Sequence, residues 1–357
     1  MEEKISELQK EQIERSEYPV VGAKYNNEYK NLDEVVSSDG KIELIDINSK
    51  EGMKIYRRTL TYIMGKAFWH TYPEAHVIVN YQLSNAMYCD IENVEVTDEM
   101  IEKVKAKMQE IINQDLKIEK RVMTRDEAEK FYKETNSPKG RLQFDLEDRQ
   151  NINMYYCDEY YNYIYETIAT HTGATKVFDL QKYSKGFLLR YPSTKNVNEL
   201  PEFHETKKLL WALQEYETIY KVLNVGTVYR LNKAVKENTI KYLILLSEAL
   251  HEKKISQMAD KIAERKGVKM VLIAGPSSSG KTTFAQRLGI QLKINGLKPV
   301  TISVDNYFVE REDTPRNEKG EYDFESIDAI DIDLFNKHLL ALLNGEEVEM
   351  PEFDFHE

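Results

Sequence analysis

The chain has 357 residues, a hydrophobic fraction of 41% and a formal net charge of −12 at pH 7, which suits two or three domains with sizeable cores. The acidic balance argues against a general nucleic-acid or membrane-surface binder, because both of those partners are polyanions; a local basic face stays compatible with it. Two cysteines, a charged N-terminus and no apolar run near the ~20 residues that span a bilayer favour a cytoplasmic protein without a membrane partner.

The first half of the chain predicts a short charged helix, a small β-rich piece and a mixed α/β domain. The helix covers residues 1–16 and the β-rich piece residues 18–46. Three later segments predict helices: 56–72, 97–116 and 124–135. Alternating runs predict four strands: 77–79, 87–91, 176–180 and 186–191. Residues 136–140 predict a loop, and the tyrosines of residues 155–165 favour a half-buried surface or a strand edge.

The second half begins with a polar linker at residues 192–201, which carries two prolines. Four helices are expected after it: 204–223, 235–265, 282–294 and 332–343. Two apolar runs predict buried strands, 268–274 and 299–304. This alternation of strands and helices is typical of an α/β domain with a parallel sheet.

One stretch carries the strongest functional signal. Residues 275–282 fit the phosphate-loop pattern G-x-x-x-x-G-K-[ST] at every fixed position, between a predicted strand and a predicted helix. Glycines bring backbone N–H groups close to an anion, and the helix directs its positive end at the same place. The nucleotide-binding residues that we expect are Gly275, Pro276, Ser277, Ser278, Ser279, Gly280, Lys281, Thr282 and Thr283.

Within this loop, Lys281 is expected to reach the β- and γ-phosphates of ATP, and the Thr282 hydroxyl to hold Mg²⁺. The alternative interpretation is a serine-rich surface turn. Asp305 follows the second predicted strand, at the carboxyl end where ligands of open α/β sheets bind. It could act as the general base on an acceptor hydroxyl or hold Mg²⁺ through water. The alternative is a turn aspartate that caps the next segment of the chain.

Other kinds of site lack support in the sequence. The seven histidines and two cysteines form no H-x-x-x-H or C-x-x-C pairing, so no metal cluster is expected. After residue 304 no apolar strand ending in an acidic residue follows, and no arginine-bearing lid, although a phosphate-loop kinase needs both. Two strands also cannot form a covered parallel sheet. We therefore expect a piece of a longer protein, trimmed at both ends, which is a poor catalyst alone.

Four blocks in the second half resemble the uridine kinase/phosphoribulokinase family in order and spacing: residues 275–285, 301–308, 322–331 and 348–355. The resemblance covers residues 266–357 and implies the first half of a P-loop domain with a doubly wound parallel sheet. It also implies that Asp305 activates a nucleoside 5′-hydroxyl and that Tyr307 lies in the segment lining the nucleoside pocket. Glu325 falls where the family has an aspartate on the ribose hydroxyls, and Phe353 falls where uridine kinases carry a base-contacting tyrosine.

The front of the chain is similar to the N-terminal part of threonyl-tRNA synthetase. Residues 18–46 resemble the second half of a TGS domain, and residues 55–192 resemble the editing-type α+β domain. Residues 58–73, 83–90 and 158–160 carry this second match. The reactive positions of the editing domain fall at Arg58, Tyr62, Ile164 and Ile168. Because none of the four keeps the reactive residue type, deacylation is not expected.

The predicted organisation has five parts: a leader (1–17), a partial TGS-like piece (18–50), an editing-like α+β domain (51–192), a linker and helical region (193–265), and half of a P-loop domain (266–357). The predicted reaction is transfer of the ATP γ-phosphoryl group to a ribonucleoside 5′-hydroxyl with Mg²⁺. The alternatives are a sugar-phosphate acceptor, or a nucleotide-sensing or RNA-associated module without turnover. Contact of the N-terminal domains with RNA or protein, and oligomerisation, stay open.

Overall fold

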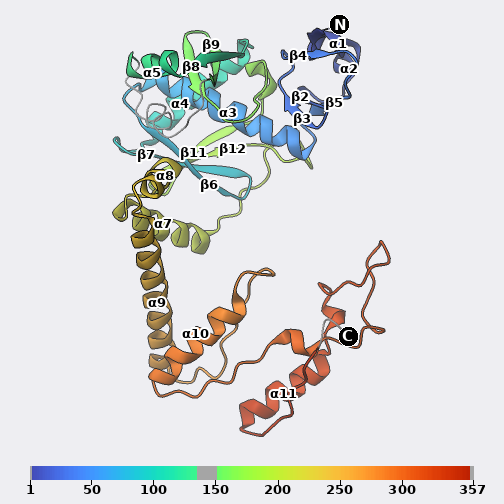
Figure 1. Cartoon of the computed structure of the whole chain (residues 1–357), viewed down its shortest axis with the longest axis vertical. Helices are drawn as coiled ribbons and strands as arrows, with labels where there is room; N and C mark the ends of the chain where they lie inside the picture. Colours follow the sequence, from blue (N-terminus) through green and yellow to red (C-terminus); the bar gives the residue numbers. More distant parts are fainter. Residues whose placement is uncertain (1, 135–150, 354–357) are drawn as a thin grey trace. The chain divides into compact units, whose positions relative to one another are not determined.

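The computed structural model describes residues 2–134 and 151–353, so the loop predicted at 136–140 lies outside the described residues. The chain divides into two compact units, Met1–Lys236 and Glu237–Glu357 (Figure 1). Each unit has hydrophobic clusters of its own. Within the described ranges, every helix is too short or too polar to cross a membrane.

The first unit begins with a β-rich piece. Its elements are β1 (Glu2–Lys4), α1 (Ile5–Leu8), α2 (Lys10–Glu14), β2 (Val20–Tyr25), β3 (Glu28–Lys30), β4 (Val35–Ser37) and β5 (Ile42–Asp46). β1 pairs with β4, and a second antiparallel sheet has the order β3-β2-β5. Ile5 is fully buried in one cluster with Ala23 and Val36. Residues 2–16, expected to form one charged helix, therefore form a strand and two short helices that pack with the sheets.

A long helix, α3 (Lys50–Thr71), forms the centre of the first unit. The Ser49 hydroxyl accepts a hydrogen bond from the backbone N–H of Gly52 at 3.0 Å and so caps the helix. Apolar side chains at helical spacing, among them Leu60, Ile63 and Ala67, are buried in the main core cluster. The helix ends just before Pro73, as expected.

A four-stranded antiparallel sheet packs against α3, with the order β11-β12-β7-β6. Its strands are β6 (Val77–Leu83), β7 (Ala86–Ile91), β11 (Asp179–Tyr183) and β12 (Gly186–Arg190). Three of them confirm predicted strands, whereas β11 begins three residues later than the strand predicted at 176–180. The sheet is covered on both faces. Cys89 and Phe187 belong to the α3 core cluster, whereas Tyr88 and Leu188 point the other way and pack with Leu210 of helix α7 (Lys207–Val222).

A three-stranded sheet with the order β10-β9-β8 completes the domain. Its strands are β8 (Glu119–Thr124), β9 (Asn151–Cys157) and β10 (Tyr160–Tyr163), beside the helices α4 (Asp98–Asn113) and α5 (Arg125–Glu134). The tyrosine-rich stretch at residues 155–165 therefore includes a hairpin, whose Tyr155 is buried and whose Tyr161 is half-buried. This confirms the interpretation of that stretch as a half-buried strand surface.

The region after α7 is helical. α8 (Val228–Lys236) ends the first unit, and α9 (Ile240–Glu264) opens the second. The single helix predicted at 235–265 is thus divided at residues 237–239, where Asn238 takes a left-handed φ of 58°. The second unit also contains α10 (Lys281–Ile294) and α11 (Ile332–Asn344), with 3₁₀ turns at Val304–Tyr307 and Ile327–Ala329.

The prediction of buried strands at residues 268–274 and 299–304 is wrong. Neither segment is a strand, and Leu272 and Val300 are 80% and 70% exposed. No strand is assigned among residues 237–353, so these segments have no neighbour with which to form a hydrogen-bonded ladder. The parallel sheet expected for this unit is therefore not formed by the described residues.

Candidate functional site

The phosphate-loop residues lead directly into α10. Gly280 is the residue before the helix and has a φ of 84°, a left-handed conformation that glycine adopts without steric cost. The Ser279 backbone N–H donates to the Pro276 carbonyl at 3.3 Å, which closes a turn inside the loop. A Cβ on Gly275 would lie 2.8 Å from the Ser279 Oγ, so a larger residue there would require the exposed Ser279 side chain to move.

Polar groups of the loop are open to solvent. The three serines at 277–279 are exposed, and so are Thr282 and Thr283 in the first turn of α10. The first N–H groups of a helix have no intrahelical acceptor, and the helix dipole makes that end positive. The Lys281 ammonium donates to the carbonyls of Gly275 and Pro276, both at 3.0 Å. The loop therefore offers backbone donors, a cation and hydroxyls, a donor set that fits a nucleoside triphosphate with Mg²⁺.

α9 holds the phosphate-loop helix in place. Leu288 and Leu292 of α10 are buried in one cluster with Ile255 and Ala259 of α9. Polar contacts run along the same interface. The Glu252 carboxylate lies 2.6 Å from the Arg287 guanidinium and accepts a hydrogen bond from Gln291 at 2.8 Å. The Asn295 amide donates to Asp260 at 2.9 Å.

Asp305 lies in the 3₁₀ turn Val304–Tyr307, and its side chain is exposed. The described contacts include no hydrogen bond or ion pair between residues 275–283 and this turn, so they do not join the two expected parts of the site. The Tyr307 ring, expected near the nucleoside, is only 1% exposed. Its hydroxyl lies 3.2 Å from His338 Nδ1 and 3.4 Å from the Met350 sulfur.

An aromatic cluster forms beside the Asp305 turn. The ring centroid of Phe308 lies 5.5 Å from that of Phe324 and 5.4 Å from that of Phe353. The structure thus brings Phe353 next to the segment after Asp305, through Phe308 and not through Tyr307. Glu325, next to Phe324, is exposed, and its backbone N–H donates to Asp323 at 3.1 Å. Phe308 was missed from the sequence, although it directly follows Tyr307.

The four positions that match the editing residues are occupied by side chains that pack in the core or donate hydrogen bonds to backbone carbonyls. The Arg58 guanidinium donates to the Thr167 carbonyl at 3.2 Å and pairs with the Glu166 carboxylate. Burial lowers the pKa of Arg58. The Tyr62 hydroxyl lies 3.1 Å from the carbonyls of Tyr155 and Tyr160, and burial raises its pKa.

The N-terminal β-rich piece contacts the same region. Ile168 is fully buried, Ile164 is partly buried against the core, and the Asn31 side chain donates to the Ile168 carbonyl at 3.2 Å. The side chains at these matched positions hold neighbouring segments together.

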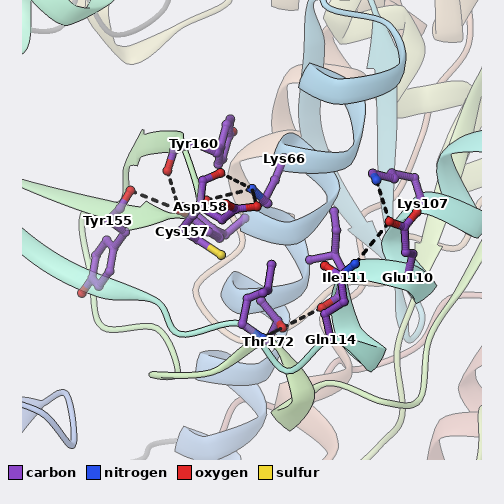
Figure 2. Close-up of polar contacts among 12 residues, drawn as sticks. Lys66, Lys107, Glu110, Ile111, Gln114, Tyr155, Cys157, Asp158, Tyr160 and Thr172 are labelled. Atoms are coloured by element: carbon purple, nitrogen blue, oxygen red, sulfur yellow. Dashed lines mark hydrogen bonds and ion pairs between the residues drawn. The ribbon is translucent and has the colours of Figure 1, made fainter.

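A buried lysine close to these positions was missed from the sequence. Lys66 on α3 is 1% exposed, and its ammonium donates to the carbonyls of Cys157 and Asp158 at 2.8 and 2.6 Å (Figure 2). The Asp158 carboxylate lies 3.6 Å away. The available signal was the place of Lys66 beside the apolar stripe of α3, one residue before Ala67.

Known proteins match the two halves of the chain differently. Residues 270–357 match the Phosphoribulokinase / Uridine kinase family. The N-terminal region matches threonine–tRNA ligases. Identity is 29% over 164 residues with the ligase of Fusobacterium nucleatum, which covers 45% of this chain and 26% of the ligase. With the ligase of Clostridioides difficile the identity is 29% over 232 residues, which covers 64% of this chain and 32% of the ligase. With that of Clostridium tetani it is 33% over 137 residues, which covers 38% of this chain and 21% of the ligase.

These matches confirm the composite organisation that the sequence indicates: a synthetase-like front and a kinase-family segment behind it. The chain spans only 26% and 32% of the length of the first two relatives. Among residues 2–134 and 151–353, no cluster of three histidine, cysteine or acidic side chains could hold a metal ion.

Proposed function

We propose that the second unit binds ATP with Mg²⁺ and transfers the γ-phosphoryl group to the 5′-hydroxyl of a ribonucleoside. The observation that carries the proposal is the loop of residues 275–280, which enters α10 through the left-handed Gly280 with its polar groups exposed. Backbone N–H groups at a helix N-terminus bind phosphate without further side-chain chemistry. The match of residues 270–357 to a kinase family supports the same assignment.

Three residues have separate roles in this proposal. Lys281 releases its two carbonyl partners and binds the β- and γ-phosphates, and the Thr282 hydroxyl holds Mg²⁺. The bound metal ion neutralises charge on the phosphates. Asp305 takes the proton from the acceptor hydroxyl, because its carboxylate is exposed and can come within hydrogen-bond reach of a bound acceptor.

The aromatic cluster favours a nucleoside over a sugar phosphate as the acceptor. Phe308, Phe324 and Phe353 offer aromatic faces and edges next to the Asp305 turn. Stacking of a base on an aromatic side chain stabilises binding by roughly 1–3 kcal/mol. Glu325, adjacent to Phe324, is the candidate acceptor for hydrogen bonds from ribose hydroxyls.

The test measures phosphoryl transfer by the intact protein from labelled ATP to a panel of ribonucleosides and sugar phosphates. Lys281→Ala should abolish ATP binding, whereas Lys293→Ala, at the far end of α10, should leave it unchanged. Asp305→Asn should keep the ATP affinity and lower turnover by roughly 10²–10⁴-fold, the usual contribution of a general base. ATP binding without phosphorylation of any acceptor would refute the kinase and favour a nucleotide-binding module.

A further inference from the structure

Tyr307 is anchored at four points, although it lies only two residues after the exposed Asp305. Its hydroxyl contacts His338 and Met350, and its ring packs edge-on against Phe335 with centroids 5.1 Å apart. Its carbonyl accepts a hydrogen bond from the Asp331 N–H at 2.7 Å. Asp331 in turn caps α11, since its carboxylate accepts from the Leu334 N–H at 2.9 Å.

The turn that carries Asp305 has little support of its own. Inside it, the Asn306 N–H reaches the Ser303 carbonyl at 3.3 Å, which is a long bond. Asp305 itself is exposed. A 3₁₀ turn of four residues is a weak element alone. The direction of the Asp305 carboxylate therefore depends on how firmly Tyr307 is held against α11.

We propose that His338 is a positioning residue, which fixes the Asp305 carboxylate by holding the Tyr307 hydroxyl against α11. The inference rests on the proposed function, in which Asp305 is the general base. His338 is half-buried on α11, and its ring also packs against the Tyr307 ring with centroids 5.8 Å apart. A base must lie within hydrogen-bond reach of the proton it takes, and a misplacement of about 1 Å can cost up to 10²-fold in rate.

The first experiment compares kcat and KM of the intact protein with Tyr307→Phe, His338→Ala and His338→Asn. Tyr307→Phe removes only the hydroxyl, and His338→Ala removes its partner, so each should lower kcat by about tenfold. KM for ATP should stay unchanged, because the nucleotide loop lies on α10. The side-chain amide of His338→Asn can take the place of Nδ1 and should restore at least half of kcat. Lys337→Ala, exposed on α11, is the matched control.

The double variant tests whether the two side chains act through one contact. Tyr307→Phe with His338→Ala should be slower than wild type by clearly less than the product of the two single effects, because both variants remove the same hydrogen bond. Multiplied effects would overturn the inference, and so would an unchanged kcat in both single variants. A His338→Asn variant as slow as His338→Ala would also overturn it.

A second readout does not depend on turnover. Backbone amides of residues 304–309 should exchange faster in Tyr307→Phe and His338→Ala, while those of α10 should not change. Unchanged exchange at 304–309 would refute the anchor itself. If the wild-type protein phosphorylates no acceptor while the exchange responds, the proposed function fails and the anchor stands, so the two failures are distinguishable.

Discussion

Replacing Lys66 by methionine should destabilise the first unit by about 2–4 kcal/mol. The ammonium donates to two carbonyls, Cys157 and Asp158, from a position that is 1% exposed (Figure 2). Hydrogen bonds from a charged donor contribute roughly 1.5–3 kcal/mol each. Methionine fills a similar volume and removes the cost of burying a charge, which offsets part of the loss. The remaining loss should lower the melting temperature by roughly 4–16 °C for a unit of this size.

Two control variants separate the hydrogen bonds from the ion pair and from the helix. The Asp158 carboxylate is 64% exposed, so Asp158→Asn should cost less than about 1 kcal/mol. Lys54 lies on the same helix but is exposed and pairs with Glu51 at 3.2 Å. Lys54→Met should therefore stay within about 0.5 kcal/mol of wild type.

The assay is denaturant unfolding followed by tryptophan fluorescence. The chain has two tryptophans, Trp69 and Trp211, and both belong to the first unit. The signal therefore reports that unit even though the whole chain does not unfold in one step. A loss below about 1 kcal/mol in Lys66→Met would refute the reasoning, because the two carbonyls would then not depend on the ammonium.

The remaining predictions concern a thiol and two helix glycines. Burial raises the pKa of Cys157 to about 11, although nearby Lys66 opposes this, so neither Cys157 nor the buried Cys89 should react with a thiol reagent at pH 8 in the folded protein. In the unfolded chain the Cys157 thiol titrates near a pKa of about 8.5. Its contribution to the free energy of unfolding is therefore complete below that pH and is lost as the pH rises towards 11. Cys157→Ala should reduce this pH-dependent loss, as measured by urea unfolding. Gly65→Ala should destabilise α3, because a Cβ would lie 2.5 Å from the Tyr160 hydroxyl. Gly289→Ala in α10 should instead stabilise by about 0.5–1 kcal/mol, since the nearest atom there is at 3.9 Å. Circular dichroism during thermal unfolding would check both, and equal signs would contradict the steric argument.

Local patterns predicted α3, α4 and the β6–β7 hairpin of the first unit. The apolar stripe of α3 and the alternating runs of β6 and β7 depend on neighbours a few residues away, which the sequence displays directly. Lys66 could not be placed in this way, because its partners Cys157 and Asp158 lie about 90 residues later and meet it only in the folded domain. Strand β8 was missed for a similar reason, because its sequence does not show the partner strand β9 with which it pairs.

In the second unit, local patterns predicted strands that the described residues do not form. Residues 268–274 and 299–304 have strand composition, but a strand exists only when another backbone supplies its hydrogen bonds. The pattern of residues 275–282 could be recognised from the sequence because it consists of fixed residue spacing within one short segment. The resemblance implied that Tyr307 lies in the segment lining the nucleoside pocket, and only the packing of α11 shows that its hydroxyl is directed to His338.

The contact between α9 and α10 determines at which residue an excised second unit of this chain can begin. The family match starts at residue 270 and α9 ends at Glu264, so α9 lies wholly upstream of the match. A truncation that begins at residue 266 would nevertheless uncover Leu288 and Leu292 and leave Arg287 without its carboxylate. The 25 residues of α9 extend over about 37 Å. An excised second unit should therefore include α9 from Ile240 onward, because α9 packs along α10.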